Sequence, residues 1–379
     1  MDFQLNAEQR MWQETAHNFC QTELKPRAAQ TDTEARLPLD VIKKMAPLGL
    51  LALPVPEAEG GPGLDVLSAA IAIEEMGRAC GSTALSVAAH NGLCLSPLIA
   101  FGTAEQKAKY LPALMSGERL GALALTEPGA GSDLAGAQTT ATLEDDGWII
   151  NGSKAWITNP SLSSIVITLC RTDRDAGTHG FSLLIVETDR PGFLINPPEK
   201  KMGLKGSPTH MLTFDSVRVP HENLLGEAGR GLQQTLATLD GGRIGIGAMA
   251  VGLAQAALDE ALSYAKERQT FGRPIAQHQA IQHMLADMST EIEAARLLVY
   301  RAAWLKNQGQ PFSKEAAMAK LFASETAERV AFKALQIHGS YGYSAEFPLE
   351  RIYRDQRLLT IGEGTSEILR TVIARRVLE

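Results

Sequence analysis

A single carboxylate, Glu363, stands between Gly362 and Gly364 in the sequence IGEGTSEILR. Glycine on both sides lets the backbone approach a ligand closely and adopt dihedral angles that other residues avoid. Thr365 or Ser366 is expected to cap the helix that follows, and the first amides of that helix are free to bind an anion or a carbonyl oxygen. A carboxylate held beside them is suited to act as a general base. An ordinary glycine-rich loop that caps the last helix is the alternative interpretation.

A second glycine-rich segment, ALTEPGAGSDLAG, covers residues 124–136. A predicted strand runs into it, and Gly129 and Gly131 would present consecutive backbone amides there, while Thr126 and Ser132 add hydroxyl groups. Such a loop can bind phosphates or the polar edge of a flat ring, although it lacks the Gly-Lys-Ser/Thr ending of a P-loop. A plain β-turn is the alternative.

Three further segments contain candidate ligand-binding residues. Trp156 and Thr158 share a predicted strand, where an indole beside a hydroxyl could cover a conjugated ring or could simply pack in a β core. Arg268 and Arg273 flank an aromatic residue in RQTFGR, which predicts either an anion-binding corner or a structural corner between two helices. The sequence QIHGSYGY ends a long predicted helix, and its first glycine, Gly339, is a possible C-cap.

The sequence GIGAMA at residues 245–250 matches the Gly-x-Gly-x-x-Ala form of the dinucleotide fingerprint, with Glu267 at a suitable distance. That fingerprint requires a preceding strand, whereas the residues before this segment have a helical pattern. We therefore expect these small residues to let helices pack closely, and we predict no nicotinamide site here.

The chain has 379 residues, of which 45% are hydrophobic and 21% charged, with a net charge of −7. This is a globular composition with room for two or three domains. We expect no nucleic-acid partner, because there is no basic stripe, and no membrane insertion, because no apolar stretch is interpreted as a span. The N-terminus has no targeting pattern, which predicts a cytoplasmic bacterial protein or a mature protein of the mitochondrial matrix. The cysteines are predicted to be buried free thiols, and no metal is expected because no His/Cys cluster has ligand spacing.

Three regions with different secondary-structure patterns must position these residues. Residues 1–120 have helical patterns, 121–228 contain short strand-like runs separated by turns, and 229–379 return to long helical patterns. Short strands with no helices between them predict an antiparallel barrel or sandwich, and long helices that are apolar on one face predict a four-helix bundle. The fold class is therefore multidomain α+β, with an N-terminal helical domain, a central β-domain and a C-terminal bundle.

Details of the N-terminal region can also be predicted. Asn6 and Gln9 have the spacing of a capping box at the start of the first helix. Residues 82–101 form a small-and-apolar run that predicts a buried helix. A helix over 105–110 is expected to end before Pro112, since proline removes a backbone donor.

In this order, the segments resemble the acyl-CoA dehydrogenase family over essentially the whole chain. ALTEPGAGSDLAG is similar to the first family signature, and QIHGSYGY with its continuation to Asp355 is similar to the second, with Ser340 where many members have glycine. KMGLKGSPTHMLTFDSVRVPHENLLGE and the RQTFG corner are also similar to family segments. The resemblance implies the three-part fold, bound FAD, a homotetramer that is a dimer of dimers, and an electron-transfer flavoprotein as the electron acceptor.

The resemblance also implies roles for individual residues. It implies that Glu363 is the catalytic base, because the helix that carries the base in some other members has Gly242 at that position here. The FAD contacts that it implies are Leu125, Thr126, Gly131, Ser132, Trp156, Thr158, Thr365 and Glu367, together with Arg268, Gln279, Gln336 and Gly339, which would reach the FAD of a neighbouring subunit. The substrate contacts that it implies are Ser132, Asp240, Arg243 and Gly364.

The implied reaction is the α,β-dehydrogenation of an acyl-CoA thioester to the trans-2-enoyl-CoA. Glu363 would take the pro-R α-proton, and the β-hydrogen would leave as hydride to flavin N5. The backbone amide of Glu363 and a ribityl hydroxyl of FAD would hold the thioester oxygen. We expect burial to raise the pKa of Glu363 towards neutrality. A flavin oxidase or monooxygenase on the same fold and a non-catalytic acyl-CoA-binding homologue are the alternatives.

The preferred substrate is predicted to be a short acyl-CoA, straight or with one methyl branch, as in fatty acid β-oxidation or branched-chain amino acid degradation. The sequence LDGGRIGIG resembles that of short-chain and short-branched members. The expected pocket wall is residues 85–95, in which small Ala88 and Ala89 could leave a channel for a longer tail. Larger residues of the same segment could close the pocket early: Leu85, Val87, Leu93, Cys94 and Leu95.

Overall fold

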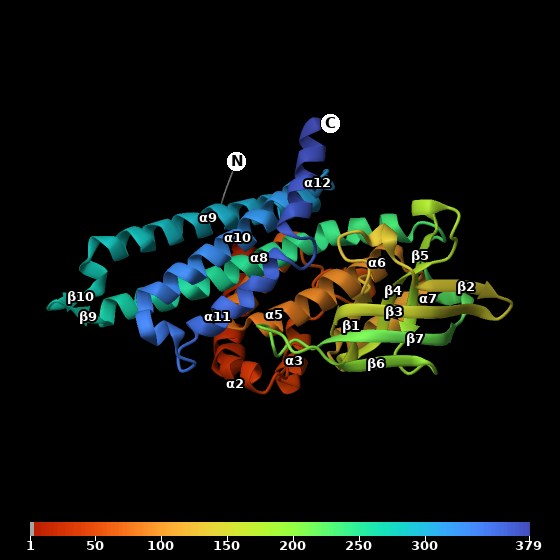
Figure 1. The fold of residues 1–379 in the computed structure, drawn as a ribbon, viewed down its shortest axis with the longest axis horizontal. Helices are drawn as coiled ribbons and strands as arrows, with labels where there is room; N and C mark the ends of the chain where they lie inside the picture. The colour runs from red at the N-terminus through yellow and green to blue at the C-terminus, as the bar shows by residue number, and fades with distance from the viewer. Residues whose placement is uncertain (1–3) are drawn as a thin grey trace.

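The computed structural model describes residues 4–379, which form three parts. Figure 1 shows the long helices of the C-terminal part on one side and the strands on the other. The N-terminal helices lie along both of them. The three-part multidomain α+β architecture predicted from the sequence is confirmed.

The N-terminal part is entirely helical. Its α-helices are α1 (Ala7–Phe19), α2 (Ala28–Thr33), α3 (Leu39–Met45), α4 (Val66–Ala79), α5 (Gly81–Ala88), α6 (Ser96–Phe101) and α7 (Ala104–Met115). The capping box is confirmed, because the Gln9 amide donates to Asn6 Oδ1 at 2.8 Å and the Asn6 amide donates to Gln9 Oε1 at 3.1 Å. The predicted stop before Pro112 is wrong. Helix α7 continues to Met115, and Leu111 and Leu114 on either side of the proline are buried.

The central part is a sheet with the strand order β6-β7-β3-β2-β4-β5-β8, and β1 pairs with β4. The strands are β1 (Leu120–Ala124), β2 (Thr140–Glu144), β3 (Gly147–Thr158), β4 (Ser163–Arg171), β5 (Phe181–Glu187), β6 (Phe193–Pro198), β7 (Thr209–Val219) and β8 (Leu224–Leu225). Most neighbours are antiparallel, as predicted, but β1 runs parallel to β4, and one parallel bridge joins Thr140 to Arg171. Parallel pairing of β1 is possible because β2 and β3 lie between it and β4 in the sequence.

Both faces of this sheet are buried, and successive residues of β4 pack on opposite sides. Ile165 and Ile167 belong to a core with the N-terminal helices, whereas Val166 belongs to a second core with β3 and β7. This alternation follows from the two-residue period of a strand. The loop after β1 and the irregular end of β3 are therefore held by a sheet that is packed on both sides.

The C-terminal part consists of long helices joined by short connections. Its elements are α8 (Gly231–Glu267), α9 (Gln279–Asn307), α10 (Ser313–His338), α11 (Leu349–Gln356) and α12 (Ser366–Leu378), with the small hairpin β9 (Gln269–Thr270) and β10 (Arg273–Pro274) between α8 and α9. Helix α8 is continuous through GIGAMA, so no strand precedes that sequence. A β-carbon on Gly252 would lie 2.1 Å from the backbone carbonyl oxygen of Glu74, and one on Gly247 would lie 3.0 Å from a methyl group of Val299. The small residues permit close helix packing, as predicted.

Two helical stretches, Gly81–Phe101 and Gly231–Glu267, are long and apolar enough to cross a membrane by length and composition alone. This corrects the expectation that no apolar stretch has these properties. In this protein 61% and 78% of their respective apolar windows are buried inside the fold. Helices that are apolar on all sides are also typical of the core of a large protein, and both stretches occupy that position here.

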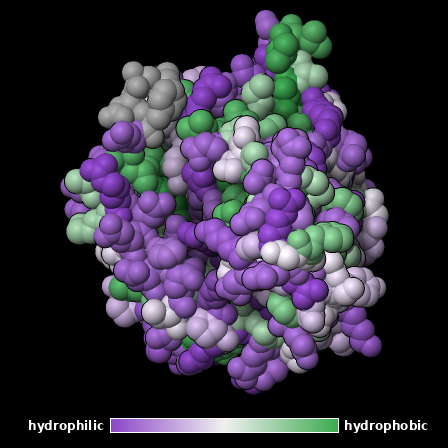
Figure 2. Space-filling model, turned by 90° about the vertical axis from the view of Figure 1, so that its left-hand side faces the viewer, coloured by the Kyte–Doolittle hydropathy of each residue, from purple (hydrophilic) through white to green (hydrophobic). Residues whose placement is uncertain are grey.

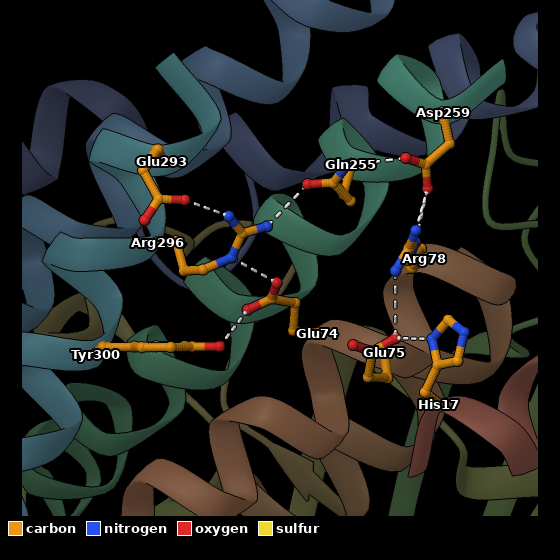
Figure 3. A network of polar contacts seen from close by, with 9 residues as sticks. All are labelled: His17, Glu74, Glu75, Arg78, Gln255, Asp259, Glu293, Arg296 and Tyr300. Atoms are coloured by element: carbon orange, nitrogen blue, oxygen red, sulfur yellow. Dashed lines mark hydrogen bonds and ion pairs between the residues drawn. The ribbon is translucent and has the colours of Figure 1, made fainter. Parts of the chain in front are cut away.

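A network of charged residues around the buried Glu74 and Glu75 joins the N-terminal part to the bundle (Figure 3). Arg296 on α9 contacts Glu74 on α4 at 2.9 Å, and the Tyr300 hydroxyl donates to the other oxygen of the same carboxylate at 3.0 Å. Nearby, Arg78 on α4 donates to Asp259 on α8 at 2.7 Å. Because these contacts bridge α4, α8 and α9, they fix the position of α8, which contributes to the candidate site.

Candidate active site

The loop that carries Glu363 has an unusual backbone. Glu363 has a φ of +53° and Gly364 a φ of +100°, so two consecutive residues occupy the left-handed half of conformational space. That conformation is easy for glycine but unfavourable for glutamate. Thr365 then caps α12, because its hydroxyl accepts the Ile368 amide at 3.3 Å. The structure thus selects Thr365 over Ser366 as the N-cap, and the strained turn lies directly before a capped helix.

The Glu363 side chain points into the protein. The residue as a whole is partly exposed, but its Oε2 atom is buried and has no hydrogen-bond partner among residues 4–379. Burial raises the pKa of Glu363 to about 7, while the charges of Lys320 and Arg243 oppose the rise. A carboxyl with this pKa is close to half ionised at neutral pH, which suits a general base.

Helix α8 lies against this carboxyl at Gly242. A β-carbon added there would lie 2.5 Å from Glu363 Oε2 and 3.2 Å from Leu93. The absence of a side chain at Gly242 is therefore what makes room for the carboxylate. Leu93 is the one residue of the predicted pocket wall that this contact places near Glu363. Cys94, by contrast, points towards Gly121 of β1.

Asp240 and Arg243, which were predicted to contact substrate, occur on the same helix. They form an ion pair with each other, Arg243 is 5% exposed, and its Nε atom has no partner within the described part of the chain. One terminal nitrogen of Arg243 lies 4.0 Å from the position that a β-carbon on Gly364 would take. Glu363, Gly364, Asp240 and Arg243 are therefore brought together.

The glycine-rich loop after β1 lies beside β3. The Ala155 amide donates to the Thr126 carbonyl at 2.8 Å, and the next residue, Trp156, is 61% exposed at a φ of +61°. A shift in register between Lys154 and Ile157 accompanies this conformation and turns the indole outward. The space around Gly131 is open, because an added β-carbon there meets nothing within 4 Å. Leu125, Thr126, Gly131, Ser132, Trp156 and Thr158 thus share one region of the sheet.

An ion pair that no sequence pattern predicts holds this loop in place. The Glu127 carboxylate accepts bonds from Lys154 Nζ at 2.9 Å and from the Gln138 and Thr139 amides at 2.7 and 2.9 Å. Lys154 is fully buried and also donates to the Leu125 carbonyl at 3.0 Å. Burial opposes the ionisation of Glu127, but Lys154 and the two amides outweigh it and lower its pKa. A lysine directly before the apolar residues Ala155, Trp156 and Ile157 of a predicted strand was the available signal.

The remaining predicted residues occupy other positions. Glu367 is exposed in the first turn of α12. Four residues that were assigned to a neighbouring subunit's FAD lie at the ends of α8, α9 and α10, next to the β9–β10 hairpin: Arg268, Gln279, Gln336 and Gly339. Figure 1 shows that end of the bundle on the side opposite to the sheet. It faces the viewer in Figure 2, where the surface is mostly hydrophilic. One chain therefore does not bring these four residues to Glu363.

Comparison with protein families gives the same three-part division. Residues 6–118 match the N-terminal domain of acyl-CoA dehydrogenase, 122–217 match the middle domain, and 229–378 match the C-terminal domain. A probable acyl-CoA dehydrogenase, YngJ of Bacillus subtilis, is 52% identical and covers 100% of both chains. The mitochondrial short-chain specific acyl-CoA dehydrogenase of Mus musculus is 48% identical over 97% of this chain and 89% of its own length.

Solved structures have the same fold. Butyryl-CoA dehydrogenase from Megasphaera elsdenii superposes with a TM-score of 0.97 at 43% identity, and covers 100% of both chains. A chain from a study of the electron transferring flavoprotein of Acidaminococcus fermentans superposes with a TM-score of 0.98 at 45% identity, also over 100% of both chains. Identity of this size over the full length shows common family membership. The chain belongs to the acyl-CoA dehydrogenase family, a family of FAD-dependent oxidoreductases.

Proposed function

We propose that this protein converts a short acyl-CoA thioester to the trans-2-enoyl-CoA, with Glu363 as the base that removes the α-proton. The observation that carries the proposal is the Glu363 carboxyl itself. It is buried, lacks a partner at Oε2 among the described residues, has a pKa of about 7 and faces the side-chain-free surface of Gly242. Such a group is free to accept a proton from a bound molecule at neutral pH.

The residues present fit a bound FAD. The open backbone at Gly129 and Gly131 leaves room for a polar ring edge or for phosphate, and the exposed indole of Trp156 offers an apolar surface beside it. The Ser366 hydroxyl is buried without a partner in the part of the chain that the structure describes. The FAD contacts proposed for this subunit are Leu125, Thr126, Gly131, Ser132, Trp156, Thr158, Thr365 and Glu367. When bound, FAD supplies the hydride acceptor.

The protein's own residues then have distinct tasks. Glu363 takes the α-proton at its carboxylate, and its backbone amide is the proposed donor to the thioester oxygen. Arg243 and Asp240 hold each other and are proposed to line the substrate site together with Gly364 and Ser132. Removal of water from this buried site strengthens each of these interactions.

Both the names of the relatives and the shape of the site support a short acyl chain as the substrate. The mouse relative is described as short-chain specific and the Megasphaera structure as a butyryl-CoA dehydrogenase. In this chain Leu93 lies within 3.2 Å of the β-carbon position of Gly242, directly beside Glu363. A leucine next to the reacting carbons leaves a shallow acyl pocket. Each buried methylene contributes about 0.8 kcal/mol to binding, but only while the pocket has space for it. We therefore propose a straight acyl chain of about four carbons.

The site is proposed to be completed in a homotetramer. Arg268, Gln279, Gln336 and Gly339 are at the far end of the bundle from Glu363, so in a single chain they have no role at this site. A second copy could bring them to the FAD. An electron-transfer flavoprotein is proposed as the electron acceptor, since a chain of this fold occurs in a study of such a protein. A cytoplasmic or mitochondrial location remains the expectation from the sequence.

The test is an anaerobic titration of the purified yellow protein with butyryl-CoA. The wild-type flavin absorbance should bleach, and heat-released cofactor should migrate as FAD. Glu363→Gln keeps the shape of the side chain and should bind butyryl-CoA with almost no bleaching, because a positioned base contributes roughly 10²–10⁴-fold. A variant that keeps more than about a tenth of the wild-type rate would exclude Glu363 as the base. Rapid O2 consumption during turnover would support the oxidase alternative instead.

A further inference from the structure

A second buried lysine contacts the loop that carries Glu363. Lys320 is on α10, is 0% exposed, and donates a hydrogen bond from Nζ to the Gly364 carbonyl at 2.6 Å. Among residues 4–379 this is its one hydrogen bond, and no carboxylate lies within 4.0 Å of it. A buried ammonium group with so few partners is costly for folding, because charge loses its hydration in the interior. Its presence therefore calls for a compensating role.

Close helix packing brings Lys320 to this position. Gly247 of α8 faces the backbone of Lys320, and a β-carbon there would lie 3.6 Å from Lys320 Cα. Gly242, just over one turn earlier on the same helix, faces the Glu363 carboxyl. The two glycines thus let α8 approach α10 on one side and the 363–364 turn on the other. The side chain of Lys320 extends from α10 to the Gly364 carbonyl in this turn.

The hydrogen bond falls on the strained part of the loop. Glu363 and Gly364 both have positive φ, and a non-glycine residue in that conformation costs roughly 1–3 kcal/mol unless its surroundings hold it there. Thr365, directly after the turn, caps α12. Lys320 binds the carbonyl of Gly364, the last group of the turn before Thr365. Together they determine where the Glu363 carboxylate points.

The charge of Lys320 also acts on Glu363. The groups whose charges face this carboxyl are Lys320 from α10 and Arg243 from α8. Asp240 is already paired with Arg243, and Glu367 of α12 is exposed. Burial raises the pKa of Glu363, and both cations oppose that rise. The pKa of Lys320 is itself lowered to about 8, by burial, with Arg243 contributing and Glu363 acting in the opposite direction.

We propose that Lys320 is a positioning residue for proton abstraction, which holds the 363–364 turn through the Gly364 carbonyl and favours the ionised form of Glu363 through its charge. The proposal rests on the assignment of Glu363 as the base. It gives Lys320 two separable roles, one that needs a hydrogen-bond donor and one that needs a positive charge.

Three substitutions separate these roles. Lys320→Gln retains a donor without the charge, Lys320→Met retains neither, and Lys320→Arg retains both. Lys201→Met is the matched control, because Lys201 is also a largely buried lysine whose pKa is lowered to about 8 by burial, but it binds Ser207 and Thr209 in the β-domain. Each variant is measured as the FAD-loaded protein for the pH profile of kcat/KM with butyryl-CoA, for kcat and KM separately, and for thermal unfolding.

The expected result is a shift of the acid limb of kcat/KM to higher pH by roughly 1–3 units in the Gln and Met variants, because loss of a nearby opposite charge raises a carboxyl pKa by that amount. Lys320→Met should also lose at least about tenfold in kcat at high pH, where Glu363 is ionised again but its turn is no longer held. Lys320→Arg and Lys201→Met should keep the wild-type profile.

An acid limb that stays within about 0.3 pH unit of wild type in both neutral variants would overturn the proposal, whatever their stability. If neither neutral variant folds, Lys320→Arg must fold with a wild-type profile. Failure of all three while Lys201→Met folds would show that Lys320 serves the core alone. The base assignment is tested separately, because an inactive Glu363→Gln with unshifted Lys320 variants would leave Glu363 as the base and reject only the role of Lys320.

Discussion

Gly242 and Glu363 fit together so closely that one methyl group would separate them. A β-carbon on Gly242 would lie 2.5 Å from Glu363 Oε2, a distance that two such atoms do not adopt without movement. Gly242 is in the middle of a helix, where glycine is unfavourable by about 1 kcal/mol relative to alanine. Glycine at this position leaves the space that the carboxylate of the proposed catalytic base occupies.

Gly242→Ala should therefore displace the Glu363 carboxylate and reduce kcat/KM about 100-fold, since a shift of about 1 Å in a reacting group has an effect of that size. Gly245→Ala is the matched control. It lies on the same helix, and its added β-carbon would meet nothing within 4 Å. This control should keep its activity and unfold at an equal or higher temperature. Equal activity of the two alanine variants would refute the close fit.

The pH dependence of activity should follow Glu363. Its pKa is raised to about 7 by burial, and the base must be ionised to accept a proton, so kcat/KM should rise with pH and level off above about 8. Steady-state rates with butyryl-CoA from pH 5 to 9 provide the measurement. A profile that is already flat at pH 5 would contradict a base with a raised pKa.

Stability should respond to the same carboxyl in the opposite direction. Its folded pKa of about 7 exceeds the ordinary value of 4.5, so the folded state binds the proton more tightly. The stability that this provides is present below pH 4.5 and is lost as the pH rises through 7, by at most about 3 kcal/mol. Glu363→Gln should therefore melt at a higher temperature than wild type at pH 8, with a smaller difference at pH 5. A constant difference across this range would contradict the linkage.

The Glu127–Lys154 pair should control cofactor retention. Lys154→Met leaves the Glu127 carboxylate buried and short of one partner, and removal of one member of such a pair costs about 3–5 kcal/mol. We expect a lower unfolding temperature and a loss of FAD on gel filtration, because the loop from Thr126 to Ser132 loses its anchor. The double variant Glu127→Leu, Lys154→Met should recover part of the stability. Full FAD retention in Lys154→Met would show that the ion pair is irrelevant to the loop.

The enzyme should prefer short acyl chains. The value of kcat/KM should be highest for butyryl-CoA and should fall sharply at C8, C12 and C16, with isobutyryl- and isovaleryl-CoA as branched comparisons. Leu93→Ala should move the maximum to longer chains, because it removes a side chain beside Gly242 and Glu363. A wild-type maximum at C8 or beyond would show that Leu93 does not close the pocket, while the family membership would stand.

Assembly should matter for the cofactor. Arg268 is exposed at the end of the bundle opposite to the sheet, so Arg268→Ala should leave the fold of the chain unchanged. If a second subunit uses this arginine, the variant should lose FAD more readily while it remains a tetramer by light scattering. An active, FAD-saturated monomer of the wild-type protein would rule out a shared site.

The sequence alone determined the order of the parts and the chemistry of the exposed loops. Helical and strand periods gave the three regions, because each period reflects which side of an element faces a core. The family segments carried Glu363, the TEPGAGS loop and Trp156, since these local motifs keep their order along the chain.

Only the tertiary structure decided which residues act on one another across long separations. The pairs Gly242–Glu363, Lys320–Gly364 and Glu127–Lys154 each join elements that are remote in sequence, and no local pattern encodes their contact. Helix α7 continued through Pro112, and β1 joined β4 in parallel, because burial against neighbouring elements outweighed local preference. The raised pKa of Glu363 has the same origin, since burial raises it and Gly242 of the remote helix α8 lies against the carboxyl.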